Sequence, residues 1–348
     1  MKYIFCALWF LYSGSLFAQK SMQVSAVAFY NFENLFDTSD DPKNWGDDEF
    51  LPTGTYNYTG KVYKEKLHNL ATVISQLGTN ITPDGPAIIG TAEIENDQVL
   101  KDLTQQPEIK GRYRFIHFDS YDSRGIDVAM LYNPAYFKVL HAKGLFVDIS
   151  KTGDMKGGKT RDVLYVNGLL AGDTVHIFVN HWPSRRGGEA ASAPLRAAAA
   201  LVSKKIMDSL RAKNPDTKII LMGDLNDDPT NESVSLVLGA KGAINYVSNN
   251  ELYNPWVWYY QKGYGTLGYD DRWNLFDQII ISGSFLKKNN KDQNHWEYYK
   301  SEVFKKDFMT EKFGQYKGYP KRSFSNNQWN NGYSDHFPTI VYFIKTAK

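Results

Sequence analysis

Cysteine is almost absent from the sequence: its 348 residues include one, Cys6, near the N-terminus. An intramolecular disulfide bond is therefore excluded, and stability must come from core burial or bound ions. Internal repeats, coiled-coil heptads and Pro/Ser-rich linkers are missing too, so nothing in the composition divides the chain. We expect one large domain, in which residues 37–60 and 282–331 form loop-like insertions.

Long hydrophobic runs are missing beyond the N-terminus, and no later stretch is expected to cross a bilayer. The start combines Lys2, an apolar run over residues 4–11 and the small residue Ala18. This order is typical of a secretory signal peptide, so residues 1–18 are predicted to be removed and 19–348 to form the mature domain. A membrane anchor is the alternative, but the apolar run is shorter than the roughly 20 residues that a span requires. We therefore expect export, to the periplasm or to the exterior.

A large excess of charge of either sign is also missing, since 40 basic residues stand against 38 acidic ones, a formal net charge of +2. Overall charge therefore cannot drive strong binding to nucleic acid, and any such contact has to come from a local positive surface. Arg161, Arg185 and Arg186 are candidates for that surface.

The order of the expected elements indicates the fold class. Apolar stripes predict helices over residues 61–77 and 190–212, with a shorter one at 233–238. Strand-like runs occupy residues 24–30, 86–90, 113–118, 126–132, 137–147, 163–170, 174–180, 218–222, 276–281 and 338–343. Because long series of strands separate the helices, a simple parallel sheet is disfavoured. We predict an α/β fold in which two mixed β-sheets pack face to face with helices on the outer faces, a four-layer αββα sandwich.

Polar residues stand where several of these strands begin or end. Asp224 and Asn226 follow one apolar run, while Asp335 and His336 precede another. Loops at one edge of two such sheets would bring together Asn31, Glu93, His181, Asp224, Asn226, Asp277, Asp335 and His336. Carboxylate and amide oxygens bind hard divalent cations, and histidine can act as a base or a phosphate ligand. The set therefore indicates a phosphodiesterase that uses a hard metal ion.

Taken singly, these residues also have structural interpretations. Glu93 could be an acid at a helix N-terminus, and Asn31 could be a turn or cap residue. Asp277 interrupts an apolar strand, and a buried carboxylate is costly without a partner. His336 is its natural partner, and the pairing would also fix the orientation of the imidazole ring.

Eight short motifs, in order along the chain, resemble those of the endonuclease/exonuclease/phosphatase superfamily and of its deoxyribonuclease-like branch. They are Tyr30–Asn34, Ala92–Asn96, Arg124–Ala129, Thr160–Asp162, Asn180–Trp182, Gly223–Asn226, Asp277–Gln278 and Ser334–His336. Each motif is weak alone, but eight in sequence are specific. The Asp-rich loop 37–49 is similar to loops of exported bacterial nucleases of this group. The resemblance implies a two-sheet sandwich and phosphoester hydrolysis with Mg²⁺, with Mn²⁺ and Ca²⁺ as alternative ions.

Carried over by position, the resemblance implies metal ligands. Glu93 would be the main ligand, with Asn31 and Asp335 helping. Glu95 is a rival for Glu93, because the residues that follow Glu93 depart from the pattern of many relatives.

The resemblance also implies roles in catalysis and substrate binding. Asp224 would bind metal or activate water, and Asn226 would position the phosphate. His336, held by its carboxylate partner, would be a base or a phosphate ligand. His181 would contact phosphate and donate a proton, and Arg161 would bind phosphate.

Three functions remain open from the sequence. The first is an exported nuclease that hydrolyses DNA, and RNA as a second candidate, by in-line attack of activated water. The second is a sphingomyelinase-like phospholipid hydrolase or an inositol-phosphate hydrolase, for which the aromatic run 256–260 could supply a membrane-facing hairpin. The third is a binding protein without catalysis. The first implies nucleic acid as a substrate, membrane lipid enters only under the second, and no stable protein partner is implied.

Overall fold

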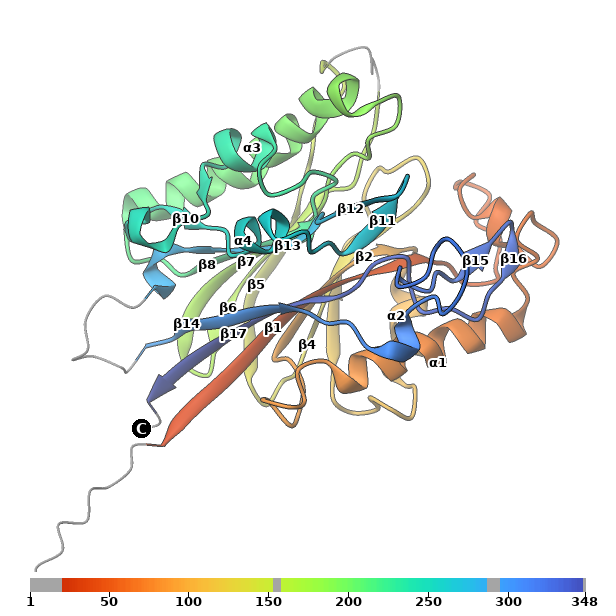
Figure 1. The fold of residues 1–348 in the computed structure, drawn as a ribbon, viewed down its shortest axis with the longest axis horizontal. Coiled ribbons are helices and arrows are strands. Elements are labelled where there is room, and N and C mark those ends of the chain that lie inside the picture. The colour runs from red at the N-terminus through yellow and green to blue at the C-terminus, as the bar shows by residue number, and fades with distance from the viewer. Residues whose placement is uncertain (1–20, 153–157, 287–294, 347–348) are drawn as a thin grey trace, which may run out of the picture.

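The computed structural model describes residues 21–152, 158–286 and 295–346 (Figure 1). The predicted signal peptide, residues 1–18, lies outside the described residues and stays a prediction. Among the residues that are described, no helix combines the length and the apolar character that a membrane span needs.

The first of two large sheets has six strands, and helices cover its outer face (Figure 1). In spatial order the strands are β14 (Glu297–Val303), β17 (Thr339–Thr346), β1 (Met22–Leu35), β2 (Ile88–Ile94), β4 (Asp127–Tyr132) and β3 (Arg114–His117). The covering helices are α1 (Gly60–Gln76) and α2 (Asp97–Thr104).

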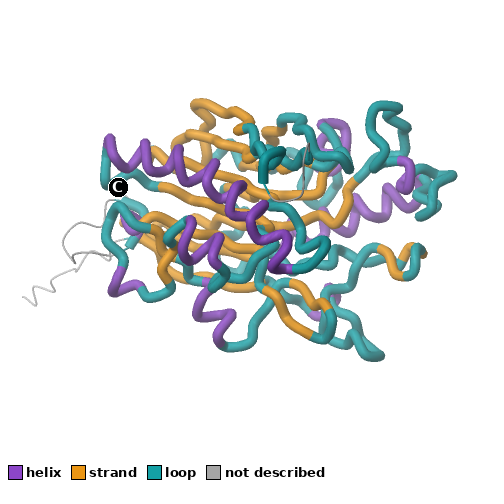
Figure 2. Tube along the Cα trace, turned by 90° about the horizontal axis from the view of Figure 1, so that it is seen from above, coloured by secondary structure: helices purple, strands orange, loops and turns teal. Residues whose placement is uncertain are grey.

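The second large sheet has seven strands. Their order is β5 (Phe137–Leu145), β6 (Val163–Leu170), β7 (Asp173–His181), β8 (Ile219–Asp224), β13 (Asp277–Ser282), β10 (Leu252–Tyr253) and β9 (Ala240–Lys241). The long helix α3 (Glu189–Lys213) and the π-helical turn η2 (Ser233–Val237) cover its outer face, and Figure 2 shows α3 lying over the strands.

Shorter elements complete the described chain. Two small hairpins, β11 (Leu267–Tyr269) with β12 (Arg272–Asn274) and β15 (Phe324–Ser325) with β16 (Gln328–Trp329), lie outside the large sheets. The short helices are η1 (Asp48–Phe50), η3 (Ile244–Tyr246), α4 (Trp256–Gln261), η4 (Gly283–Phe285) and η5 (Asp307–Met309).

Alternating side chains of the central strands explain the layers. In β1, Val27 and Phe29 belong to the apolar cluster between the sheets, whereas Ala28 belongs to the cluster under α1 and α2. In β8, Met222 faces the other sheet and Leu221 faces α3. Because successive strand residues point to opposite faces, each central strand fills two layers of core at once. The predicted four-layer sandwich is confirmed.

Strand direction brings the polar strand ends to one edge. β1 runs parallel to β2, and β7 runs parallel to β8, so the carboxyl ends of each pair lie together. β17 is antiparallel to β1, and β13 is antiparallel to β8, so these two strands begin where the others end. A hydrogen bond of 3.1 Å from Asn31 Nδ2 to Asp224 Oδ2 joins the two sheets at this edge.

Some elements differ from the expectations. The region 282–331, expected to be loop-like, contains the edge strand β14, and the helix α2 was not predicted. β14 has the sequence Glu-Tyr-Tyr-Lys-Ser-Glu-Val, in which charged residues hide the apolar alternation. Charged side chains are common on edge strands, where they discourage pairing with another chain.

Candidate functional site

The centre of the site is a row of three side chains across the second sheet. Asp224 at the end of β8 has His181 of β7 as its register partner on one side and Asp277 of β13 on the other. His181 Nε2 is 3.6 Å from Asp224 Oδ2. All three residues are buried. Backbone pairing therefore places an imidazole and two carboxylates next to one another.

The turn that follows β8 depends on close packing. A Cβ atom on Gly223 would lie 2.2 Å from the Asn180 carbonyl oxygen, so another residue would push β7 and β8 apart. Asn226 has a left-handed φ of 48°, and its backbone N–H donates to Asp224 Oδ1 over 3.0 Å. Its side-chain Nδ2 donates to the Trp182 carbonyl oxygen over 2.8 Å. Asp224 and Asn226 thus share one turn after β8.

The pKa of Asp224 is raised by its surroundings. Burial raises its pKa to about 7; Asp277 and Glu93 add to this shift, and His336 opposes it. A carboxyl group with a pKa near neutrality can accept a proton from water at the pH of most cells.

Glu93 reaches the site from the first sheet through an irregularity in the strands. The register of β1 against β2 shifts between Asn31 and Leu35, and Glu93 lies in this shift with a left-handed φ of 61°. The Asn34 backbone N–H donates to Glu93 Oε2 over 2.9 Å. Glu93 Oε1 lies 3.8 Å from His181 Nε2, across the gap between the sheets. A strained conformation at a bulge is a common way to redirect a functional side chain.

Glu95, the rival of Glu93, points elsewhere. Its Oε2 accepts a hydrogen bond of 2.7 Å from the Asp37 backbone N–H, which ties the next loop to the end of β2. Burial raises the pKa of Glu95 to about 8. The structure therefore brings Glu93, rather than Glu95, beside His181 and Asp224.

The predicted pair of Asp277 and His336 is present. His336 Nδ1 lies 2.7 Å from Asp277 Oδ2, and His336 Nε2 faces Asp224 Oδ2 at 3.9 Å. The Ser334 hydroxyl accepts from the His336 backbone N–H and donates to the Asn31 carbonyl oxygen, which fixes this turn against β1. Burial opposes protonation of His336, but Asp277 and then Asp224 outweigh it and raise its pKa well above the ordinary value.

His181 has the opposite electrostatic environment. Burial, followed by the positive charge of Arg161, holds its pKa well below the ordinary value. Its Nδ1 atom is buried and has no hydrogen-bond partner among the described residues. The surroundings therefore shift the two site histidines in opposite directions, His181 toward the neutral form and His336 toward the charged form.

Arg161 lies behind His181. Its Nε donates to the His181 carbonyl oxygen over 3.2 Å, one Nη to the Trp182 carbonyl oxygen over 2.6 Å, and the other to Asp122 over 2.9 Å. The side chain is 6% exposed. Three of its five N–H donors thus hold the protein, and the phosphate-binding role of Arg161 stays a prediction. The contacts favour a positioning role.

Asp335 belongs to a charged network that the sequence analysis missed. Arg322 donates to Asp335 over 2.8 Å and lies 3.7 Å from Glu33, while fully buried Lys66 donates to Ser323 over 2.6 Å. Burial raises the pKa of Glu33 to about 7, and Asp335 adds to this shift. Lys66 shares the apolar stripe of α1, three residues after Tyr63, and a lysine in such a stripe is a signal that could have been read. Arg322, in a loop, offered none.

The donor atoms fit a hard divalent cation. One ligand atom each from Glu93, His181 and Asp224 lies within 4.8 Å of the others, and so do atoms of Asp224, Asp277 and His336. Asp277 Oδ1 is buried and has no hydrogen-bond donor among the described residues. Carboxylates gathered in a buried site need a compensating positive charge, and Mg²⁺, Mn²⁺ and Ca²⁺ all accept oxygen ligands. Asp335 accepts a hydrogen bond from Arg322 in this structure, and its role as a metal ligand stays a prediction.

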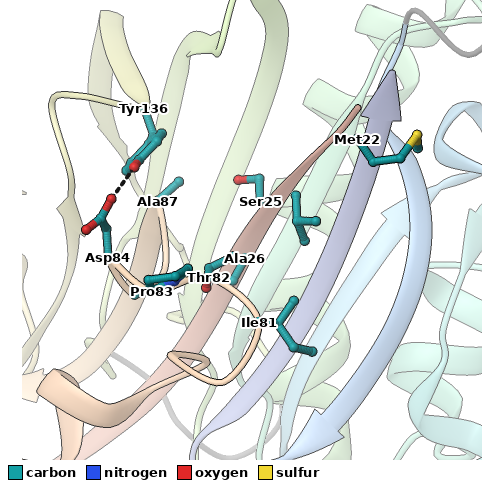
Figure 3. A pocket seen from close by; sticks show the side chains of 11 residues that line it. Met22, Ser25, Ala26, Ile81, Thr82, Pro83, Asp84, Ala87 and Tyr136 are labelled. Carbon is teal, nitrogen blue, oxygen red and sulfur yellow. Dashed lines mark hydrogen bonds between the residues drawn. The ribbon is translucent and has the colours of Figure 1, made fainter. Parts of the chain in front are cut away.

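The opposite end of β1 has a different character. Figure 3 shows a cavity there whose lining includes Met22, Ile81, Asp84 and Tyr136. Tyr136 donates a hydrogen bond to Asp84, so the acidic group already has a partner. The cavity lacks the convergent histidines and carboxylates of the other edge, which is where chemistry is expected.

Comparisons with solved structures agree with the fold. A protein of the endonuclease/exonuclease/phosphatase family from Bacteroides thetaiotaomicron is 16% identical, with a TM-score of 0.54 over 94% of this chain and 97% of that one. A mannosyl-6-phosphatase from the same organism is 17% identical, with a TM-score of 0.54 over 92% and 99%. TDP2 from D. rerio, complexed with a single-strand DNA product, is 14% identical, with a TM-score of 0.51 over 92% and 98%. At these identities the likeness shows the fold alone.

Sequence comparison identifies the family. No curated protein matches the sequence significantly. The model of the endonuclease/exonuclease/phosphatase family matches residues 26–345, which span both large sheets and every residue of the site. Members of this family are phosphoester hydrolases that depend on divalent metal ions. The chain therefore belongs to the endonuclease/exonuclease/phosphatase family.

Proposed function

We propose that the protein is an exported, metal-dependent nuclease that hydrolyses internal phosphodiester bonds of DNA, with RNA as a second nucleic-acid substrate. One observation carries the proposal: the Asp277–His336 pair of 2.7 Å meets the group of Glu93, His181 and Asp224 where the two sheets join. A TDP2 of the same fold has been solved with a single-strand DNA product, which supports a nucleic-acid substrate.

The two histidines and Asp224 divide the chemistry. Asp224, with a pKa of about 7, accepts a proton from the water whose oxygen attacks phosphorus in line with the leaving oxygen. Positively charged His336 binds a non-bridging phosphate oxygen and stabilises the charge that develops there. As the bond from phosphorus to the leaving oxygen breaks, the proton that Asp224 took from water can pass to His181 Nε2, 3.6 Å from Asp224 Oδ2, and from there to the leaving oxygen, so that His181 starts and ends neutral.

A divalent cation would be held by Glu93, with the Asn31 amide oxygen and Asp335 as the further predicted ligands. Such an ion neutralises the phosphate oxygens and polarises the phosphorus centre. The side chains of this protein supply the remaining requirements, because Asp277 orients His336 and Arg161 orients the segment of His181.

The packing of α4 bears on the alternative of a phospholipid hydrolase. The aromatic run 256–260, considered above as a membrane-facing hairpin, is part of this short helix. Trp256 is fully buried, and Tyr259 donates a hydrogen bond to the Ser301 carbonyl oxygen. Trp258 remains half-exposed. One exposed aromatic ring on a packed helix is a weak membrane anchor, so the nuclease is favoured.

A panel of substrates tests the proposal. The mature protein is incubated with plasmid DNA, RNA, sphingomyelin, inositol phosphates and mannose 6-phosphate, in Mg²⁺, Mn²⁺ or Ca²⁺. We expect nicking of the plasmid that stops when EDTA is added and that the Glu93→Gln variant lacks. Turnover of a lipid or of a phosphomonoester with intact plasmid would replace the nuclease by one of the other hydrolases, and no turnover of any substrate would favour a binding protein.

Export has its own test. The full chain is produced in a Gram-negative host, and the protein is recovered from periplasm and medium. The proposal expects a mature N-terminus at Gln19. Recovery from the cytoplasm with Met1 retained would contradict it.

A further inference from the structure

The long loop between β1 and α1 contains a second acidic group, outside the catalytic row. One carboxylate oxygen each from Asp40, Asp47 and Asp48 lies within 4.8 Å of the others. Among the described residues, none of the three forms an ion pair with a lysine, arginine or histidine. Three neighbouring carboxylates without a cation repel one another.

Asp47 differs from ordinary surface acids because it is buried. The residue is 2% exposed, whereas Asp40 and Asp48 are exposed. Its Oδ2 accepts a hydrogen bond of 2.8 Å from the Asp41 backbone N–H, but its Oδ1 is buried and has no donor among the described residues. Leaving a charged oxygen buried without a donor or a cation is costly. The environment of Asp47 is therefore incomplete as it stands.

The surroundings hold this oxygen in place. The backbone N–H of Phe50 donates to the Asp47 carbonyl oxygen over 2.7 Å, and the Phe50 ring stacks on Phe36 and Tyr56 at 4.4 and 4.8 Å. Gly46 packs against the Arg124 backbone so closely that a Cβ atom would lie 2.0 Å from its carbonyl oxygen. Because the loop is anchored on both sides of Asp47, the carboxylate cannot simply turn out to water.

We propose that Asp40, Asp47 and Asp48 bind a calcium ion that stabilises this loop. Calcium accepts six to eight oxygen ligands in irregular geometry and tolerates ligands from one short flexible segment, whereas magnesium requires a near-ideal octahedron. The three carboxylates supply the negative charge, and water completes the shell. The ion satisfies the buried Asp47 oxygen and removes the repulsion among its neighbours.

Calcium binding would act on the substrate side of the molecule. The loop begins at the end of β1, and the Asp37 backbone N–H is tied to Glu95, two residues after Glu93. The stacked rings of Phe50 and Tyr56 line a small polar cavity together with Asp335. An ion that orders the loop therefore also orders one wall beside the catalytic row, without contacting the reacting phosphate.

Trp45 provides a direct probe. It lies two residues before Asp47 and is 84% exposed. Terbium replaces calcium at oxygen sites, and its luminescence rises when a nearby excited tryptophan transfers energy to it. Terbium in the catalytic row would be sensitised by buried Trp182 instead, so a Trp45→Phe variant separates the two sites.

The experiment titrates Tb³⁺ into the full mature protein, with Ca²⁺ as competitor and Glu93→Gln as background. We expect saturable luminescence that Ca²⁺ displaces and that Trp45→Phe largely removes, although Trp45→Phe keeps the rise in Tm that Ca²⁺ causes. Asp47→Asn should lose both signals. The double variant Asp40→Asn/Asp48→Asn changes exposed residues only, and it should weaken binding by roughly tenfold or more, since affinity follows the number of charged ligands.

Three results would overturn the calcium site. They are unchanged luminescence and Tm response in the double variant, luminescence that disappears on going from the wild type to Glu93→Gln, and luminescence that Trp45→Phe leaves intact. If Asp47→Asn does not fold, the double variant decides alone. The outcome is independent of the nuclease proposal, because every readout is made without substrate.

Discussion

Two buried histidines face the same carboxylate from different sheets and differ in charge. His336 Nε2 and His181 Nε2 lie 3.9 and 3.6 Å from Asp224 Oδ2. Asp277 raises the pKa of His336 against the effect of burial, whereas burial and Arg161 lower that of His181. Residue type and burial are the same, so the neighbours alone decide which imidazole carries a proton. Phosphate can then meet a cation on one side and a neutral ring on the other.

The largest expected effect comes from removing the negative charge of Asp277, which raises the pKa of His336. In Asp277→Asn the neutral amide no longer stabilises the imidazolium, and we expect kcat to fall by about 10⁴-fold, the scale seen when a carboxylate behind a catalytic histidine is replaced. Plasmid nicking and an NMR titration of His336 would measure the effect. The double variant Asp277→Asn/His336→Ala should be no worse than His336→Ala, because the two residues act as a unit. A double variant that is a further hundredfold slower would refute the pair.

Replacement of His181 should lower kcat less than the replacement of Asp277. His181→Asn keeps a polar side chain but cannot carry a proton to the leaving oxygen, so kcat should fall by about 10²-fold to 10³-fold. KM should change little, because His336 still binds the phosphate. A substrate with a leaving group that needs no proton, such as a p-nitrophenyl ester, should recover most of the rate. Equal loss on both substrates would contradict the assignment of His181 as the proton donor.

A substitution of Arg161 tests whether this residue acts by positioning His181. Arg161→Lys retains the positive charge that lowers the pKa of His181, but it cannot make all three contacts of the guanidinium group. We expect a decrease of about 10-fold to 100-fold in kcat, the scale of a small misplacement of a catalytic group, with an unchanged pH profile. An increase in KM alone would show that Arg161 binds substrate after all.

The smallest expected effect comes from His117, a half-buried residue outside the site whose side chain is 2% exposed. Burial opposes protonation of His117, but Asp127 and Asp97 outweigh it and raise its pKa. Its contribution to stability is therefore complete below the unfolded pKa of about 6.5 and is lost as pH rises through the higher folded value. Between about pH 6 and pH 9 the wild type should lose more of its Tm than His117→Asn does. Parallel Tm curves would contradict the shift, and nuclease activity serves as the control for folding.

The layers of the fold could be predicted because strand alternation is a local property of the sequence. The residues of each central strand alternate between two core layers, and this alternation is visible in a few consecutive residues. The helix expected at residues 190–212 is found as α3, at Glu189–Lys213. The edge strand β14 could not be predicted, since at an edge one flank meets water and the apolar alternation weakens. Whether such a segment forms a strand depends on its interactions with distant segments.

The sequence predicts which residues form the site, but not how their side chains are arranged. Residues at strand ends converge once parallel and antiparallel neighbours share an edge, which is why Asp224 and His336 meet. The choice of Glu93 over Glu95 depends on a left-handed backbone at a register shift, for which the sequence has no signal because glutamate rarely adopts that conformation. The network of Glu33 and Lys66 around Asp335 requires long-range contacts that no local pattern records.

The left-handed backbone of Glu93 also bears on how this protein could evolve. Glycine at this position would relieve roughly 1 kcal/mol of conformational penalty, yet it would delete the carboxylate that reaches across to His181. Selection for heat resistance alone would thus tend to drive the position away from glutamate, while selection for turnover holds it there. The protein is therefore less stable than it could be at the residue on which its chemistry is expected to depend.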